Sequence, residues 1–336
     1  MKKLTVILFV FVSIFVISTK SMAAEGYKIV NKIHIPGDEK WDFLYSDDES
    51  SRLYVSHASM VQVVDETNGK VVGTISGLNG VHGIATAPTL NKGFITGGKD
   101  SSVTVFDTKT FQVIKKITVT GKGPDAILYD VFSNKVFVFN AKSDNCTVIN
   151  AETNEIVGTI AFEGNPEVGL SDGKGKIYVN LESKSAITVI NATTMKVEAV
   201  WSLAPGEEPT GLALDNEKHI LFSACANKMM VAVNAETGKV ITTLPIGEKP
   251  DGAAFDPTLK CAYSSNGEGT LTVVKEGADG SLSVLENFPT QKGARTIALN
   301  KKTHHIYLST ADFDSTSADK KKLVPGTFVV LDIMPQ

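Results

Sequence analysis

One short phrase returns along the chain at a nearly constant interval, and this periodicity constrains the fold more than any other feature. Residues 124–128 (Pro-Asp-Ala-Ile-Leu), 209–213 (Pro-Thr-Gly-Leu-Ala) and 250–254 (Pro-Asp-Gly-Ala-Ala) are variants of the phrase. Four further variants begin at residues 41, 81, 166 and 294, so neighbouring starts are about 40 to 44 residues apart. Internal repeats of this length indicate solenoids, propellers or arrays of small units.

Each repeat contains four short stretches rich in Val, Ile, Thr and Tyr. Residues 136–139 (Val-Phe-Val-Phe), 103–107 and 156–160 exemplify the second, third and fourth stretches, and turns such as 235–238 (Ala-Glu-Thr-Gly) separate them. This pattern predicts short antiparallel strands. An apolar period of 3.6 residues is not sustained over three turns after the N-terminal leader, so we expect almost no helix. Four strands per repeat of about 42 residues predict a blade of a β-propeller, since solenoids of this period need helices.

The two ends of the chain complement each other. The last repeat carries a polar insertion over residues 312–322 and a third strand over 328–333, but the chain stops before a fourth strand. Residues 27–35 supply the missing strand from the other end. We therefore predict an all-β fold, a seven-bladed propeller of four-stranded antiparallel blades over residues 25–336, in which the N-terminal strand closes the last blade and removes its open edge.

Residues 1–23 have the features of a secretory signal peptide. Lys2 and Lys3 precede an apolar run over residues 4–18, and Ser21 and Ala23 are the small residues expected before a cleavage site. The run is short for a membrane span of about 20 residues, and no cysteine follows it for a lipid anchor. The sequence thus predicts a periplasmic or secreted protein without a membrane span.

Composition restricts the class of partner. The chain has 33 Lys and Arg against 37 Asp and Glu, a net charge of −4, and removing the leader would make it more acidic. Nucleic-acid binding usually needs a basic surface, so this balance disfavours it. A local patch near Lys292, Arg295 and the basic run at 320–322 remains open. Cys146, Cys225 and Cys261 are interpreted as small buried apolar residues.

The connections that enter the first strand of each blade lead to one mouth of the central channel. Aligning the repeats places one side chain per blade there, and we call these the mouth residues: Asp42, His82, Asp125, Glu167, Thr210, Asp251 and Arg295. Further candidate ligand-binding side chains on the same face are an aromatic wall and four loop residues after the second strands: Trp41, His57, Asn140, Asn180 and Asn266.

Four carboxylates around one mouth repel each other. A bound proton, neutralisation by Arg295 and His82, or a divalent cation relieves such repulsion. Asp125, Glu167 and Asp251, with asparagine carbonyls nearby, are oxygen ligands that suit Ca²⁺ or Mg²⁺. The residues favour a solvated polar rim first, a surface for a ligand or partner second, and a metal-dependent catalytic site third.

The string Gly169-Leu170-Ser171-Asp172-Gly173 matches the G-x-S-x-G pattern of serine hydrolases. That chemistry needs a strand-to-helix elbow, whereas this string lies in a predicted strand-to-strand hairpin. We therefore assign no catalytic residue to it.

Several motifs point to a known family. Ile177-Tyr178-Val179-Asn180 has weaker counterparts at residues 54–56 and 306–308, and residues 290–296 (Thr-Gln-Lys-Gly-Ala-Arg-Thr) belong to the last repeat. With these motifs the chain resembles the YVTN-repeat propellers, among them the YncE-like periplasmic proteins, over its length after the leader. The resemblance implies an exported, seven-bladed ring. Some relatives are associated with DNA binding, and many have no assigned activity.

The sequence favours an exported, monomeric, non-enzymatic binding or scaffold protein. Its channel-mouth face would bind a small molecule, a cation or another exported protein. The alternative is a divalent-metal-dependent hydrolase of the lactonase kind with its site at the channel, and DNA binding is a third hypothesis.

Overall fold

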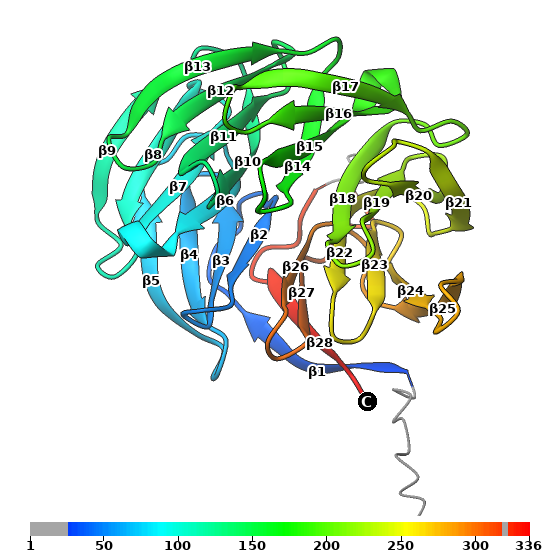
Figure 1. Cartoon of the computed structure of the whole chain (residues 1–336). Coiled ribbons are helices and arrows are strands. Elements are labelled where there is room, and N and C mark those ends of the chain that lie inside the picture. The colour runs from blue at the N-terminus through cyan, green and yellow to red at the C-terminus, as the bar shows by residue number, and fades with distance from the viewer. Residues whose placement is uncertain (1–25, 318–321) are drawn as a thin grey trace, which may run out of the picture.

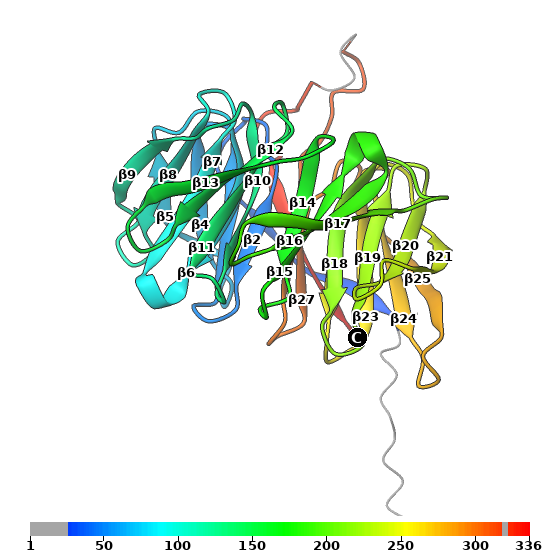
Figure 2. The ribbon, with the colours of Figure 1, turned by 45° about the horizontal axis from the view of Figure 1, so that its top comes forward.

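The computed structural model describes residues 26–317 and 322–336, and within these ranges the strands β1 to β28 form seven four-stranded antiparallel sheets. The innermost strands of neighbouring sheets contact each other around a central axis (Figure 1). Figure 2 shows the hairpin loops gathered at the two ends of the sheets. The structure thus confirms the predicted seven-bladed propeller.

Six blades follow the chain from the innermost to the outermost strand. Their strands are β2 (Leu44–Asp47), β3 (Arg52–His57), β4 (Met60–Asp65) and β5 (Lys70–Ser76); β6 (Val81–Ala87), β7 (Lys92–Gly97), β8 (Ser102–Asp107) and β9 (Val113–Thr118); β10 (Pro124–Asp130), β11 (Lys135–Asn140), β12 (Asn145–Asn150) and β13 (Glu155–Ala161); β14 (Pro166–Ser171), β15 (Lys176–Leu181), β16 (Ala186–Asn191) and β17 (Lys196–Ser202); β18 (Pro209–Asp215), β19 (Ile220–Cys225), β20 (Met229–Asn234) and β21 (Val240–Pro245); and β22 (Pro250–Asp256), β23 (Cys261–Asn266), β24 (Thr270–Glu276) and β25 (Leu282–Pro289). Two short 3-10 turns, η1 (Pro88–Leu90) and η2 (Glu182–Lys184), interrupt the hairpins.

Blade seven combines both ends of the chain. It contains β26 (Ile297–Asn300), β27 (His305–Thr310), β28 (Val329–Pro335) and, at its outer edge, β1 (Tyr27–His34). β1 runs antiparallel to β28, with Tyr27 opposite Pro335 and His34 opposite Val329, and Figure 1 shows the two strands side by side. The predicted closure is confirmed, with a strand one residue shorter than expected.

The insertion between β27 and β28 is only partly within the described residues. Phe313 forms an isolated bridge with Leu323, which brings its two arms together. Residues 318–321 of the predicted insertion lie outside the described residues, as does the expected signal peptide at residues 1–23. In the described ranges, no helix has the length and apolar character to cross a bilayer.

The hydrophobic core is divided among the interfaces between neighbouring blades. Between the first two blades, Tyr54 packs with Ile95 and Phe106, and all three are almost completely buried. The free thiols of Cys146 and Cys225 are buried as predicted, and burial raises the pKa of Cys225 to about 11. Because each blade contributes to two such interfaces, the ring is one continuous packed body.

Side chains at the hairpins explain the recurrent Asn and Asp of the repeats. Asn234 Oδ1 accepts hydrogen bonds from the amides of Glu236 and Thr237, at 3.1 and 2.8 Å, and Asp107 caps its turn in the same way. These side chains satisfy amides that the strand ladder leaves unpaired. The G-x-S-x-G string lies in the β14–β15 hairpin, where Ser171 Oγ donates to Asp130 Oδ1 at 2.5 Å.

The innermost strands are irregular where they meet the channel mouth. In β10 the pairing with β11 shifts between Pro124 and Ile127, and β6, β14, β18 and β22 show equivalent shifts at their first residues. A bulge takes a residue out of the ladder and redirects its side chain. Gly211 adds close packing, because a Cβ there would lie 2.5 Å from Ala253 N of the next blade. The fold thus places one side chain per blade at the mouth.

Candidate functional site

The mouth residues occupy equivalent positions in the structure. Five of them are the second residues of innermost strands: His82 in β6, Asp125 in β10, Glu167 in β14, Thr210 in β18 and Asp251 in β22. Asp42 and Arg295 each lie two residues before the innermost strands of their own blades, β2 and β26. The alignment of the repeats therefore predicted equivalent positions correctly, including in the two blades where the strand begins later.

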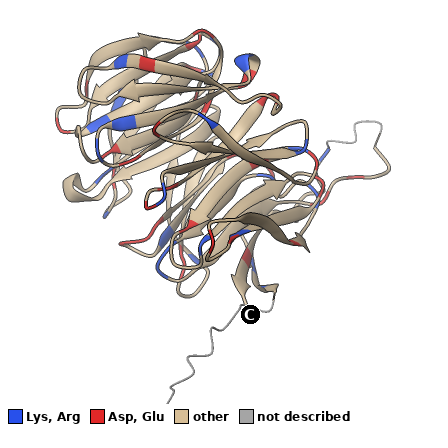
Figure 3. Ribbon diagram, turned by 45° about the vertical axis from the view of Figure 1, so that its right-hand side comes forward, with Lys and Arg blue, Asp and Glu red and all other residues tan. Residues whose placement is uncertain are grey.

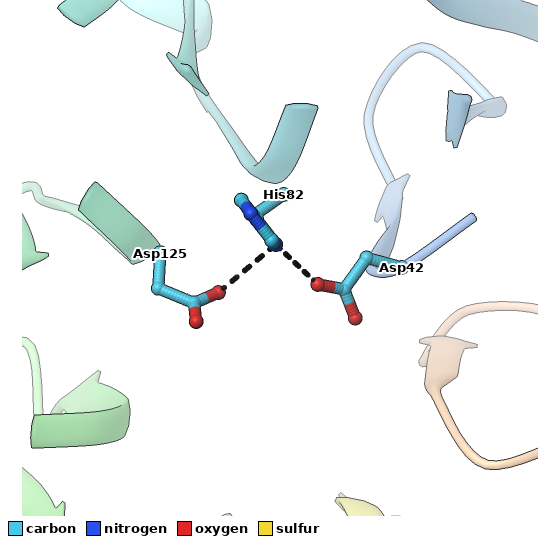
Figure 4. A group of neighbouring side chains, drawn as sticks. All are labelled: Asp42, His82 and Asp125. Carbon is cyan, nitrogen blue, oxygen red and sulfur yellow. Dashed lines mark hydrogen bonds and ion pairs between the residues drawn. The ribbon is translucent and has the colours of Figure 1, made fainter. Parts of the chain in front are cut away.

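Three mouth residues from successive blades form a compact cluster, which we call the Asp42–His82–Asp125 trio (Figure 4). His82 Nδ1 lies 2.6 Å from Asp42 Oδ2 and 3.5 Å from Asp125 Oδ1. One donor atom from each of the three residues lies within 4.8 Å of the others. Asp125 Oδ1 is buried and makes no hydrogen bond among the described residues. A carboxylate oxygen in this state is available to a ligand.

Arg295 extends the cluster to the other side of the mouth. Its guanidinium forms ion pairs with Asp251 and, at 3.4 Å from Nη2 to Oδ1, with Asp42. Five blades therefore contribute to one charged network, since Asp42 contacts both Arg295 and His82. This neutralisation by Arg295 and His82 is one of the three forms of relief that the sequence suggested for the carboxylates.

Three carboxyl groups of the mouth, those of Glu167, Asp125 and Asp251, have raised pKa values. Burial, followed by the charge of Asp125 and other nearby carboxylates, raises the pKa of Glu167 from an ordinary 4.5 to about 9. Burial and Asp42 raise the pKa of Asp125 to about 6. Burial raises the pKa of Asp251 to about 6 as well, although Arg295 opposes the rise. Glu167 is thus a neutral acid at pH 7.

Burial lowers the pKa of His82, whereas it raises the pKa of the carboxyl groups. The hydrogen bond with Asp42 raises the pKa of His82, burial opposes this rise, and the charge of Asp125 adds to it. A raised pKa favours the imidazolium, which pairs with the two carboxylates. The two carboxylates therefore attract positive charge to the position of His82, and the same attraction acts on a metal cation bound there.

Polar side chains of neighbouring blades fix the backbone of the mouth residues. Thr96 Oγ1 donates to the carbonyl of Asp125 at 2.7 Å, and Thr296 Oγ1 donates to the carbonyl of Asp42 at 2.8 Å. Ser265 donates to the carbonyl of Arg295 in the same way. Sequence reasoning missed these positioning residues. A signal existed, because the penultimate residue of the second strand is polar in five blades: Ser56, Thr96, Asn180, Ser265 and Ser309.

Other candidate residues lie inside the protein. Asn140 is fully buried and donates to Asn145 Oδ1 at 2.8 Å, and Asn266 is also fully buried. Asn180 Nδ2 donates to the carbonyl of Thr210 at 3.0 Å. The structure thus brings Asn180 beneath the mouth as a positioning residue, and it does not bring Asn140 or Asn266 to the solvent-facing rim.

His57 and Trp41 belong to an aromatic group beside the mouth. His57 is fully buried, hydrogen-bonded to Gln62 and packed on Phe328 with 4.0 Å between ring centroids. Burial lowers the pKa of His57, so its ring is neutral at pH 7. Trp41 packs against Phe328 and Phe313, at 5.3 and 6.3 Å between centroids. Trp41 remains at the edge of the face, whereas His57 is beneath it.

A cavity of about 510 Å³ opens at the opposite end of the channel. Its lining combines apolar residues of the innermost strands, such as Leu44, Leu212 and Ile297, with charged residues, which are Asp47, Asp48, Glu49 and Lys301. Charged groups therefore lie at both ends of the channel. On the ribbon as a whole, Lys and Arg are interspersed with Asp and Glu (Figure 3).

The fold and the mouth define a seven-bladed β-propeller with a charged site over its channel. Neither the protein-family models nor the curated proteins searched match the sequence. Among solved structures, the chain is similar to "Kuenenia stuttgartiensis Hydrazine Synthase", with a TM-score of 0.71 and 18% identity over 82% of this chain and 94% of that chain. It is also similar to U3-55K, with a TM-score of 0.76 and 10% identity over 92% of this chain and 98% of that chain. At these identities the similarity shows the fold alone.

Proposed function

We propose that this chain is a non-enzymatic binding protein whose channel mouth holds a divalent cation. The observation that supports this proposal is the Asp42–His82–Asp125 trio, in which three donor atoms lie within 4.8 Å of one another. The ring presents these groups from three different blades, and side chains of neighbouring blades donate hydrogen bonds to the carbonyls of Asp42 and Asp125. Such a site is rigid, and rigid placement lowers the cost of ligand binding.

The donor set indicates which cations to test. Ligand atoms lie about 2.1 Å from a zinc ion, so two ligands of one ion are at most about 4.2 Å apart. The trio is close to this spacing, and the 2.6 Å contact between His82 and Asp42 has to open slightly. An imidazole with two carboxylates suits Zn²⁺ or Mn²⁺ better than the Ca²⁺ or Mg²⁺ that the sequence suggested, which prefer oxygen ligands alone.

Cation binding at the trio must be linked to protonation. His82 has a raised pKa and Asp125 a pKa of about 6, so both bind protons more tightly than in solution. A metal ion needs these groups deprotonated. We therefore expect affinity to rise as the pH increases from 5 to 7.5, with proton release on binding.

Calorimetric titration of the purified, chelator-treated protein with Zn²⁺, Mn²⁺, Ca²⁺ and Mg²⁺ tests the proposal. We expect one site for Zn²⁺ or Mn²⁺, which Asp125→Asn and His82→Gln weaken by at least about tenfold. Asp144→Asn is a matched control, because Asp144 is an exposed carboxylate of the β11–β12 turn. Absence of binding heat with all four metals at about millimolar concentration would contradict the proposal.

A second candidate is the divalent-metal-dependent hydrolase, and Glu167 is the observation that favours it. Its pKa of about 9 makes it a proton donor at neutral pH, and its charge couples to that of Asp125 in the trio. General acids with raised pKa values serve hydrolysis in this way. Metal-dependent turnover of lactones or esters that Glu167→Gln abolishes would favour the hydrolase, and turnover that survives this change would exclude this role of Glu167.

Export of the chain is part of the same proposal. The charge and apolar pattern of residues 1–23 and the resemblance of the repeats to YVTN-repeat, YncE-like propellers support it. Fractionation of the native host, with detection of a processed N-terminus near residue 24, tests this step. A full-length chain retained in the cytosol would contradict it.

A further inference from the structure

A second cavity adjoins the trio on the same face and has the opposite charge. It has a volume of about 610 Å³ and lies between the segment before β2 and the insertion of blade seven. Four of its lining residues are basic: Lys40, Lys249, Lys292 and Arg295. Its lining contains no carboxylate within the described part of the chain. A volume of this size accommodates a small organic molecule.

The ammonium groups of three lysines in this cavity have no acidic partner among the described residues. Arg295 is paired with Asp251 and Asp42. In contrast, Lys40, Lys249 and Lys292 form neither an ion pair nor a side-chain hydrogen bond with any residue in 26–317 or 322–336. Like charges gathered around one cavity attract an anion and repel each other without one.

The remaining walls are aromatic. Trp41 and Phe313 line the cavity, with 6.3 Å between their ring centroids, and the Lys292 ammonium lies 5.8 Å from the Phe313 centroid. The indole Nε1 of Trp41 is buried and has no acceptor among the described residues. Buried Trp N–H groups usually find a partner, so a ligand oxygen at this position would complete the site.

We propose that this cavity binds a small organic anion, a carboxylate or phosphate ester carried on a flat apolar group. The anionic group lies among Lys40, Lys249 and Lys292, and the flat group packs against Trp41 and Phe313. The proposal is independent of the cation site, because the three lysines and Phe313 take no part in the trio. Arg295 borders both sites.

The fluorescence of Trp41 reports ligand binding in the test. The chain contains two tryptophans, so Trp201→Phe leaves Trp41 as the only indole. In this background, with a chelator present, fluorescence is titrated with phenyl phosphate, benzoate, benzyl alcohol and benzylamine. We expect saturable changes with the two anions and an affinity at least about tenfold weaker for the alcohol and the amine. Added salt should weaken binding of the anions.

Matched variants locate the effect. Lys249→Gln with Lys292→Gln should weaken phenyl phosphate binding by at least about tenfold, without changing the melting temperature. Lys196→Gln with Lys239→Gln is the control, since both lysines are exposed on the outer part of the blades. The proposal is overturned if neither anion binds up to about 10 mM, if the alcohol binds equally well, or if the cavity variants bind like the control. The chelator keeps this result separate from the outcome of the metal titration.

Discussion

Glu167 makes a quantitative prediction about stability, because its environment retains a proton that the unfolded chain releases. Its pKa is about 9 in the folded protein, against an ordinary 4.5. The stability contributed by this proton is fully present below pH 4.5 and is lost as the pH rises toward 9. Between these values, the free energy of unfolding should fall by about 1.4 kcal/mol per pH unit.

Glu167→Gln should remove this dependence, since glutamine resembles the protonated acid and does not titrate. The pH difference from 4.5 to 7 corresponds to about 3 kcal/mol, and partial solvent exposure of Glu167 reduces this to about 2 kcal/mol. We therefore expect the variant and the parent to be equally stable near pH 4.5. At pH 7 the variant should be more stable by about 2 kcal/mol, and the gap should widen further up to pH 9.

Urea unfolding of both proteins at a series of pH values, with a chelator present, measures this difference. Glu236→Gln provides the control, because Glu236 is an exposed residue of the β20–β21 turn. Asp125 and Asp251 titrate in all three proteins, and because their charges raise the pKa of Glu167, the pH dependence of the gap includes this coupling. If the gap between Glu167→Gln and the parent does not change between pH 5 and 9, the proposed protonation of Glu167 is wrong.

Three further changes test the ring and its mouth. Deleting residues 27–35 should lower the melting temperature by at least about 10 °C, because blade seven loses its outer strand and buried apolar groups; unaltered melting would refute the closure. Arg295→Gln should raise the pKa of Asp251 above about 6, since Arg295 lowers it. Carboxyl NMR titration measures this pKa, and an unchanged value would contradict the pairing of the two side chains. Gly211→Ala should cost about 1–3 kcal/mol, because its Cβ meets the backbone of the next blade; urea unfolding measures this, and a neutral result would show that the blades separate easily.

The architecture was predictable because it depends on periodicity. The repeated phrase, the Asn and Asp of the hairpins, and the missing last strand each have a local physical cause, and the structure has all of them. The register also followed, since the mouth residue is the second residue of each bulged strand. Asp42 and Arg295 come before shorter strands, yet the spacing still identified them.

The contacts at the mouth were less predictable, because they depend on side-chain geometry between blades. The sequence grouped Asp125 with Glu167 and Asp251 as metal ligands, whereas the structure brings Asp125 close to His82 and Asp42. Asp251 forms an ion pair with Arg295 instead. A repeat alignment identifies which blades supply a side chain, but it does not give the direction in which a long side chain reaches across the channel.

The loop residues show a different limit. Asn140, His57 and Asn266 follow second strands, where a polar residue suggests a solvent-facing role, but each is fully buried. Closely packed blades need polar side chains to satisfy interior hydrogen-bonding groups, and this need produces the same residue types as a binding site does. Composition at these positions does not distinguish the two uses.

The shared construction of blade seven has a consequence for how the molecule is made. β1 emerges first during synthesis and its partner β28 emerges last, so β1 has to wait for almost the whole chain. The strand pairing that closes the ring therefore joins segments near opposite ends of the sequence, and contacts with such long sequence separation form slowly during folding.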